Sequence, residues 1–321
     1  MPAYSSTGSG NVHIDVALSQ ISVAYPQGGF VGENLFPSVG VKRISDKYYV
    51  FGREAWQADL IDLRAPGAEA SEIPGMALSL DSYYAQEHAL QIGVNDEERE
   101  NTDSPMSPDR DATELVSSKV LLGREVAMKN LVTTAANYPA ALTTTLSGTT
   151  QWSDYVNSDP ISDFKVGKRA VHANGLYMEP NTAVIPYQVM SILEDHPDFI
   201  ERIKYSQRGL VTSEIIASLI GIPKIVVPGV GYDSAHVGQA ASLGYLWGKD
   251  VVMAWVPDRA GPKIPAFGYE FKQGEQYVDR WREDPRKRDV IRTTRRYDLK
   301  LVALDSNSKT IAGYLIKNAV A

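Results

Sequence analysis

The residue types most often used in catalysis and metal binding are scattered along this 321-residue chain. The chain has no Cys, so thiolate metal sites and disulfides cannot form. We expect His196, which precedes Pro197, to cap a helix turn rather than to act as a base, and His88 to lie in a core or an interface. We predict no metal site, because none of the five histidines has the i, i+4 spacing that binds a metal on a helix: positions 13, 88, 172, 196 and 236.

Two glycine-rich segments match phosphate-binding loops only in part. Gly244 and Gly248-Lys249 are spaced one residue too closely for a P-loop, and Asp250 stands where that motif has Ser or Thr. Gly229-Val230-Gly231 lacks the third glycine of a dinucleotide-binding loop, and no Ser lies in a nucleophile elbow. We therefore predict no catalytic residue, no cofactor and no enzymatic activity.

Two charged segments are candidates for binding. The acidic run 96–100 could bind a divalent cation, but we favour solvated charge near a helix start. The basic stretch 280–296 has eight Lys or Arg against three Asp or Glu, so it could contact nucleic acid. The alternative is a set of salt bridges to neighbouring subunits. We favour the salt bridges, because the stretch lacks a series of interleaved aromatic residues for base stacking.

The composition is that of a soluble globular protein with two or three domains. Hydrophobic residues make up 43% and charged residues 22%, and the net charge is −7. The first Lys or Arg is Lys42, and no long apolar run precedes it, so we expect no signal peptide. No stretch has the apolar length that crosses a membrane. We expect a soluble protein made in a cytosol.

An unusually long strand is predicted where large side chains alternate with small or polar ones from Met76 to Val94. At ~3.3 Å per residue such a strand would reach ~60 Å, more than a compact domain needs. Two ordinary strands with a bend near Ser82 are the alternative. We favour one long arm that lies on a neighbouring chain, and we expect the same of the Ser/Gly-rich segment 1–30.

A long helix is predicted over residues 108–137. Ser107-Pro108-Asp109 favours a helix start, Tyr138-Pro139 stops it, and its length is ~42 Å. Beyond it we expect mixed elements and an α+β fold: helices over 160–174, around 189–193 and 199–203, and over 213–220; a glycine-rich loop over 228–244; and strands over 183–185, 224–227, 251–256 and near 291–301 and 316.

The order of these features resembles the major capsid proteins of tailed bacteriophages, which have the Hong Kong 97 fold. The segment 196–205, HPDFIERIKY, with Gly209-Leu210-Val211-Thr212 and Leu219-Ile220-Gly221-Ile222, is similar to helices of that family's axial domain. Leu35-Phe36-Pro37 with 45–49, SDKYY, is similar to the start of its peripheral domain. The resemblance covers nearly the whole chain.

The resemblance implies a division of the chain into the parts of that fold: an N-terminal arm (1–34), the first part of the peripheral domain (35–51), an extended β-hairpin loop (52–95), the peripheral domain with its long spine helix (96–139), the axial domain (140–287) and the return strands of the peripheral domain (288–321).

It also implies function by assembly. The chain would be a structural subunit that forms hexamers and pentamers and closes into an icosahedral head around double-stranded DNA. Expected partners are copies of itself, a portal, a decoration protein as a further candidate, and packaged DNA in weak, non-specific contact, without a membrane. It would reside in the virion and assemble in the host cytoplasm. Two alternatives stay open: an encapsulin-like compartment shell, and a soluble nucleic-acid-binding protein using 280–296.

Two further expectations follow from comparing this sequence with the resembled family. Some members carry a long N-terminal scaffolding segment, whereas only 1–34 precede the peripheral domain here, so we expect a separate scaffold protein. Some shells are locked by an isopeptide bond from a Lys of the extended loop. No Lys lies between Tyr48 and Ser118, and the Arg residues there stay charged, so this loop cannot supply the amine.

Overall fold

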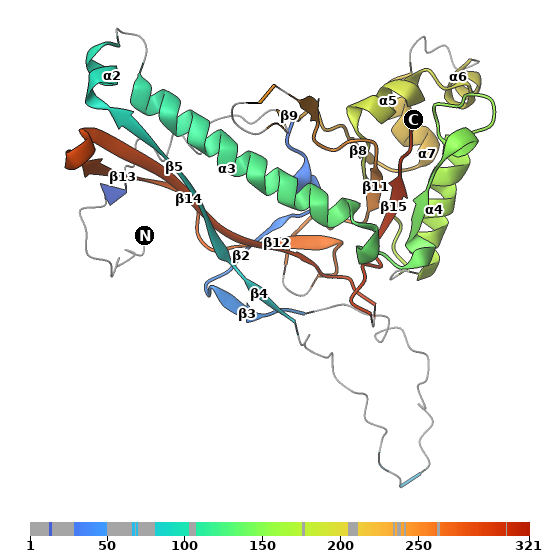
Figure 1. Ribbon diagram of the computed structural model, residues 1–321. Helices are drawn as coiled ribbons and strands as arrows, with labels where there is room; N and C mark the ends of the chain where they lie inside the picture. The colour runs from blue at the N-terminus through green and yellow to red at the C-terminus, as the bar shows by residue number, and fades with distance from the viewer. Residues whose placement is uncertain are drawn as a thin grey trace. The chain divides into compact units, whose positions relative to one another are not determined.

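The chain divides into two units, and each mixes helices with strands, as the α+β prediction requires (Figure 1). Unit 1 is Met1–Gln27, Ala85–Arg124 and Lys272–Tyr297; unit 2 is Gly28–Tyr84, Glu125–Phe271 and Asp298–Ala321. The computed structural model describes residues 13–14, 29–49, 66–67, 69, 81–102, 107–174, 177–204, 211–233, 235, 239–240, 242–261, 264–305 and 307–321.

Unit 1 is built on an antiparallel sheet. Strand β14 (Arg288–Leu301) pairs on one side with β13 (Tyr277–Glu283) and on the other with β5 (Gln86–Asn95). β1 (His13–Ile14) pairs with β13. A 3-10 turn, η6 (Asp284–Arg286), closes the hairpin between β13 and β14. The strand predicted near 291–301 is therefore confirmed as part of β14.

Two helices accompany this sheet. The five-residue α2 (Asp96–Glu100) follows β5 directly, and the backbone N–H of Asp96 donates to the Lys287 carbonyl in the turn after β13. The first turns of α3 (Pro108–Thr133) pack on the sheet through a small core, and Ser117 lies 3.4 Å from Thr293 between their hydroxyl oxygens. The core consists of Val94, Ala112, Val278 and Ile291, with Ile92 beside them.

Helix α3 begins where the sequence predicts and ends four residues earlier than expected. Its last carbonyls accept hydrogen bonds from side chains beyond the helix: the Asn137 amide donates to Leu131, and the Tyr138 hydroxyl to Val132. These contacts satisfy groups that every helix end leaves without a partner. The segment after α3 continues in 3-10 turns, η3 (Ala135–Asn137) and η4 (Ala140–Leu142).

The prediction of one long strand over 76–94 is wrong in its described part. β4 (Ser82–Tyr84) pairs with β3 (Ser45–Lys47), whereas β5 pairs with β14 over ten residues, from Asn95 to Gln86. The break falls at buried Ala85 rather than near Ser82. Both strands find partners within the chain. Residues 76–80, and most of the predicted arm 1–30, lie outside the described residues.

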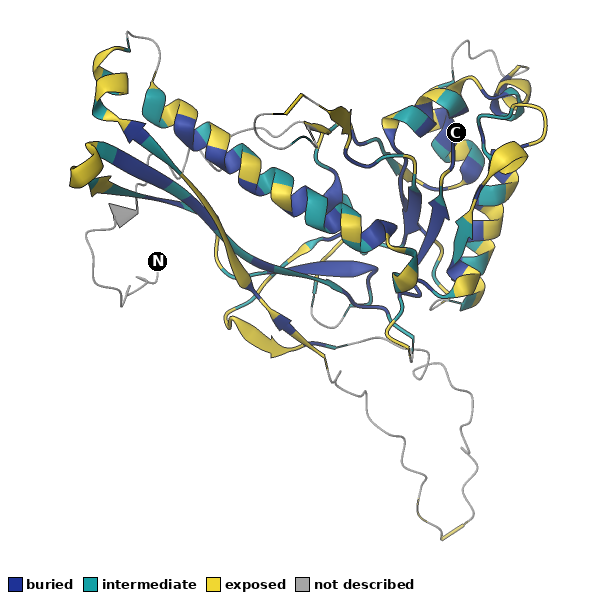
Figure 2. Ribbon diagram, viewed as in Figure 1, coloured by how far each residue is buried: buried dark blue, intermediate teal, exposed yellow. Residues whose placement is uncertain are grey.

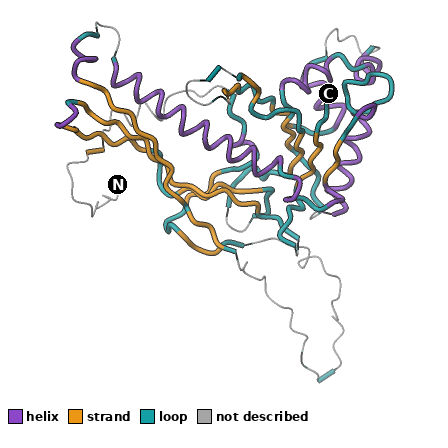
Figure 3. The backbone as a smooth tube through the Cα atoms, viewed as in Figure 1, coloured by secondary structure: helices purple, strands orange, loops and turns teal. Residues whose placement is uncertain are grey.

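Unit 2 contains a five-stranded sheet of order β6-β15-β11-β7-β8, whose strands β7, β11 and β15 are buried (Figure 2). The predicted helices and strands of this region are largely confirmed (Figure 3). Their bounds are β6 (Thr143–Thr145), η5 (Gly148–Thr150), α4 (Pro160–Asn174), β7 (Thr182–Val184), α5 (Tyr187–Glu194), α6 (Pro197–Ile203), α7 (Ser213–Ile220), β8 (Lys224–Val226), β11 (Val251–Ala254) and β15 (Gly313–Lys317).

Other elements were missed or displaced in the prediction. The expected glycine-rich loop 228–244 contains a hairpin, β9 (Gly231–Asp233) with β10 (Leu243–Tyr245). The segment 45–49 contains the short strand β3. The sequence also left out η1 (Gly32–Asn34), β2 (Ser38–Gly40) and β12 (Gly268–Lys272). No helix in the described part of the chain is both long and apolar enough to span a membrane.

Candidate functional site

The partial phosphate-loop motifs lie in turns that do not lead into helices. Gly248 has a φ of 60° in the turn between β10 and β11, and Lys249 is exposed. A P-loop needs a strand, a loop and then a helix whose N-terminus faces the phosphates. A strand follows here instead, and Gly231 likewise begins β9. No group of three or more metal-binding side chains is found among the residues that the structure describes.

The histidines whose side chains are described act as packing and capping groups. His196 is the N-cap of α6: its Nδ1 accepts from the Asp198 backbone N–H at 3.2 Å, and its Nε2 lies 3.0 Å from the Ser158 hydroxyl. The predicted capping role is therefore confirmed. His88 is exposed and its ring stacks on Tyr297, with centroids 4.2 Å apart. His172 lies edge-on to Tyr177, and His236 lies outside the described residues.

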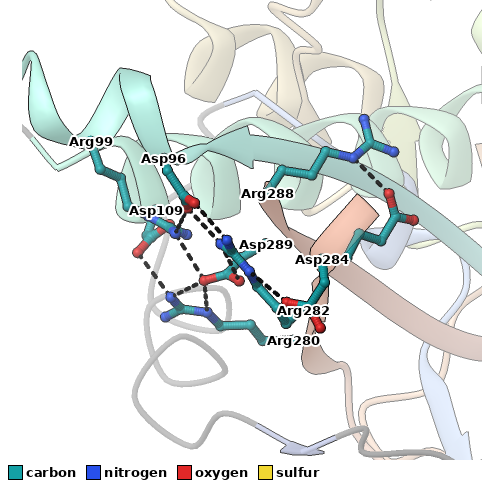
Figure 4. Close-up of polar contacts among 9 residues, drawn as sticks. Asp96, Arg99, Asp109, Arg280, Arg282, Asp284, Arg288 and Asp289 are labelled. Carbon is teal, nitrogen blue, oxygen red and sulfur yellow. Dashed lines mark hydrogen bonds and ion pairs between the residues drawn. The ribbon is translucent and has the colours of Figure 1, made fainter. Parts of the chain in front are cut away.

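A group of charged side chains lies in unit 1, where the two charged segments of the sequence meet (Figure 4). We call it the Arg–Asp cluster. Arg282 of β13 contacts Asp96 of α2 with both terminal nitrogens, each 2.5 Å from a carboxylate oxygen. The cluster comprises Asp96, Arg99, Asp109, Arg280, Arg282 and Asp289.

Asp289 is the centre of the cluster. Its carboxylate lies 2.6 Å from Arg280, 2.9 Å from Arg99 and 3.5 Å from Arg282, measured to guanidinium nitrogens. Arg99 also lies 2.5 Å from Asp109 at the start of α3. Cations and carboxylates thus alternate from α2 through α3 to β13 and β14.

The pKa shifts of the cluster follow from this alternation. Burial acts to raise the pKa of Asp289, but the hydrogen bond from Arg280 and the charges of Arg99 and Arg280 outweigh it, so the pKa is lowered. The hydrogen bond from Arg282 is the main cause that lowers the pKa of Asp96. The lowered pKa values keep the carboxyl groups of Asp96 and Asp289 ionised at neutral pH. A guanidinium that stays charged cannot act as a base or nucleophile, so the cluster joins elements rather than performing acid–base chemistry.

The rest of the basic stretch also finds carboxylates within unit 1. Arg288 lies 2.8 Å from Glu283, Arg292 lies 2.6 Å from Asp279, and Arg296 lies 2.7 Å from Glu87. The favoured interpretation, salt bridges to neighbouring subunits, is therefore wrong as to the partner. The carboxylates belong to the same chain. Six of the eight basic side chains form an ion pair with such a carboxylate: Arg280, Arg282, Arg286, Arg288, Arg292 and Arg296.

The acidic run 96–100 is likewise more than solvated charge, because it forms α2 and two of its members enter the cluster. One aromatic residue, Trp281, does lie within the basic stretch. The Arg292 guanidinium carbon is 5.1 Å from the centroid of the Trp281 ring, so this ring already makes a cation–π contact within the chain. The basic stretch is thus the turn end of the β13–β14 hairpin, and most of its cations contact carboxylates of the same unit.

A buried carboxylate that the sequence did not single out lies in unit 2. Glu125 of α3 is 2% exposed and accepts hydrogen bonds from the backbone N–H groups of Val31 and Gly32 and from the Trp247 indole. The spacing of apolar and small residues on this helix predicts a buried stripe that includes Gly123, Ala127 and Leu131, and Glu125 is not among its positions. The signal that could have found it is a Glu beside Val126 where the apolar stripe should continue.

Both units also expose large apolar side chains. Leu90 of β5 is 48% exposed and Leu115 of α3 is 50% exposed in unit 1. In unit 2 the exposed fractions reach 88% for Val156 and 82% for Leu243.

Comparison with known proteins finds similar phage proteins. No family profile matches the chain. The major capsid protein of Burkholderia phage BcepMu is 27% identical over 309 residues, which is 94% of this chain and 95% of that protein. A phage-related protein of Bordetella bronchiseptica RB50, of known crystal structure, is 26% identical with a TM-score of 0.74, over 95% of this chain and 97% of that one.

The fold alone extends to more distant proteins. The capsid structure of Cyanophage P-SCSP1u is 10% identical, with a TM-score of 0.56 over 90% of this chain and 88% of that one. Sequence similarity to a phage capsid protein along nearly the whole chain, and a shared fold, agree with the resemblance seen in the sequence. The chain is similar in sequence to the major capsid proteins of two bacteriophages, over 94% and 73% of its length, which supports its resemblance to the major capsid proteins of tailed bacteriophages.

Proposed function

We propose that this protein has the Hong Kong 97 fold and assembles as hexamers and pentamers into an icosahedral phage head that encloses double-stranded DNA. The observation that carries the proposal is the similarity to a phage capsid protein over 94% of the chain. The exposed apolar side chains in both units support it, because a shell subunit buries such groups against its neighbours. The arm, extended loop, spine helix, peripheral domain and axial domain keep the boundaries given above.

The role is structural rather than enzymatic. The charged groups that gather in unit 1 pair with one another, and the histidines with described side chains pack or cap. Similarity in sequence to a phage protein favours a phage head over an encapsulin-like compartment. The nucleic-acid-binding alternative is weakened, because most cations of 280–296 already contact carboxylates of the same chain.

The proposed partners are other copies of the chain, a separate scaffold protein, a portal and a decoration protein, with assembly in the host cytoplasm before DNA is packaged. Because the net charge is −7, we propose that the subunit binds DNA weakly, with a Kd of roughly micromolar or weaker that rises steeply with salt. Titration of labelled duplex at several salt concentrations measures this.

Electron microscopy of the purified protein, expressed alone and together with the scaffold gene of its phage, tests the assembly. We expect closed shells of one size with the scaffold, and aberrant or incomplete particles without it. Uniform shells from the chain alone would contradict the separate scaffold. A folded monomer at every protein concentration, with and without scaffold, would contradict the proposal itself. A cargo enzyme that co-purifies with empty shells would favour the encapsulin-like alternative.

A further inference from the structure

Helix α4 of unit 2 packs on its sheet with one side and leaves the other side uncovered. The buried side carries Ile161, Phe164 and Val171. On the opposite side Lys165 and Arg169 are exposed one turn apart, and Val166 between them is 44% exposed. We call Lys165, Val166 and Arg169 the α4 face.

Among the described residues, the cations of the α4 face have no carboxylate partner. Arg169 donates from Nε to the Lys165 carbonyl of the same helix, at 3.3 Å, and neither residue forms an ion pair with another residue that the structure describes. Lys168, which lies outside the α4 face, does have a carboxylate partner: its Nζ lies 3.2 Å from Oε2 of Glu179, and it also donates to the Gly221 carbonyl. The α4 face thus combines positive charge with an exposed apolar group.

A second surface of unit 2 carries the opposite charge. Glu194 ends α5, Asp195 follows it, and Glu201 lies on α6; all three are exposed. In the part of the chain that is described, none of the three forms an ion pair. On α6, Ile200 next to Glu201 is 44% exposed. We call Glu194, Asp195, Ile200 and Glu201 the α5–α6 corner.

The α5–α6 corner is held in a fixed geometry. His196 lies at its centre, caps α6, and contacts Ser158 in the segment before α4. The Tyr155 ring meets the His196 ring edge-on, with centroids 5.5 Å apart. Because these contacts fix the positions of the acidic groups before any partner arrives, little ordering cost remains for docking.

We propose that the α4 face of one copy of this chain docks against the α5–α6 corner of a second copy. The inference rests on the proposed function, since it names one contact by which shell subunits join. The α4 face sets Val166 between two exposed cations, whereas the α5–α6 corner sets Ile200 among the exposed carboxylates of Glu194, Asp195 and Glu201, which outnumber the exposed cations Arg202 and Lys204. Opposite signs attract, and two like surfaces would repel, so the contact joins two different surfaces in a fixed order.

Charge reversal on each side tests the contact. The first variant is Lys165→Glu with Arg169→Glu, and the second is Glu194→Lys with Glu201→Lys. We expect each to lower the yield of assembled particles by about tenfold at low salt, because like charges then meet across the contact. A 1:1 mixture of the two variants, and the quadruple variant, should return the yield to near that of the wild-type protein.

A matched control changes the charge equally elsewhere on unit 2. Lys224→Glu with Lys249→Glu reverses two exposed cations that are not part of the α4 face, and should assemble like the wild-type protein. Thermal unfolding of the unassembled subunits checks that every variant folds.

The outcomes separate the inference from the proposed function. If wild-type shells form and both reversal variants assemble equally well, the inference is overturned and the proposed function stands. Failure of the mixture and the quadruple variant to restore assembly also overturns it, as does an α4 variant that assembles normally but loses only DNA retention. If the wild-type protein forms no particle under any condition, both fail.

Discussion

The indole nitrogen of Trp247 donates a hydrogen bond of 2.9 Å to the carboxylate of Glu125, inside unit 2. The backbone N–H groups of Val31 and Gly32 donate to the same carboxylate at 2.9 to 3.1 Å. A buried carboxylate is stable only when such donors replace its water. Glu125 therefore fixes the start of η1 and the segment before β11 to one turn of α3.

Glu125→Ala should destabilise the unassembled subunit by about 3 kcal/mol or more, since several buried donors lose their acceptor together. Urea unfolding of the subunit, monitored by tryptophan fluorescence or circular dichroism, measures the change. Trp247→Phe is the matched comparison: it keeps most of the ring's packing, removes one donor, and should cost about 1 kcal/mol. A loss below about 0.5 kcal/mol for Glu125→Ala would show that Glu125 does not anchor these segments.

Asp289→Asn should loosen the Arg–Asp cluster. Its carboxylate contacts three Arg side chains and is 13% exposed, so we expect a loss of about 1 to 3 kcal/mol that shrinks as salt is added. Asp284→Asn is the control, because Asp284 is 88% exposed and lies 3.4 Å from Arg282. Equal effects of the two substitutions on urea unfolding would contradict a central role for Asp289.

The same aspartate gives the subunit a defined acid sensitivity. The folded pKa of Asp289 is lowered from an ordinary value of 3.8, so its contribution is fully present above pH 3.8 and is lost as the pH falls through the folded pKa. Stability measured from pH 5 down to pH 2 should fall more steeply for the wild-type protein than for Asp289→Asn. Parallel curves would remove the cluster as the cause.

His196 predicts a second pH dependence, at milder acidity. Burial lowers its folded pKa from the ordinary 6.5, more than the charges of Asp198 and Asp159 raise it, so the folded state favours the neutral ring. Its contribution is therefore complete above pH 6.5 and is lost as the pH falls below that value through the folded pKa. His196→Asn keeps a capping group without a proton to gain, and its melting temperature should change less between pH 7.5 and 5.

The helices of unit 2 could be predicted from the sequence because their limits are local. Asp159-Pro160 begins α4 and Asn174 ends it, and Gly221, with a φ of 71°, ends α7. Such signals act within one turn of the helix and do not depend on distant parts of the chain. The apolar side of α3 was predictable only up to Val120, since beyond it the buried positions include Glu125, whose donors come from distant segments.

The strands of unit 1 were harder to predict because their partners are distant in sequence. β13 carries charges on both faces, and such a pattern in the sequence predicts a solvated segment. Only the fold shows that Asp279 of β13 pairs with Arg292 of β14. The long alternation over 76–94 misled for another reason. Tyr83 is buried and Tyr84 is 56% exposed, whereas Val94 is buried further along, so the inward side changes from odd to even positions at Ala85. The pattern of residue types alone does not show such a change of face.

The last prediction concerns covalent locking of the shell. An isopeptide bond needs a neutral Lys amine to attack a side-chain amide of a neighbour. The predicted extended loop 52–95 contains no Lys, and its cations, Arg53 and Arg64, cannot serve as the nucleophile. Shell stability must then come from non-covalent contacts or from a decoration protein. Mature particles boiled in detergent should run as a single band near 35.2 kDa. A ladder of covalent multimers, traced by mass spectrometry to a residue of 52–95, would overturn the prediction.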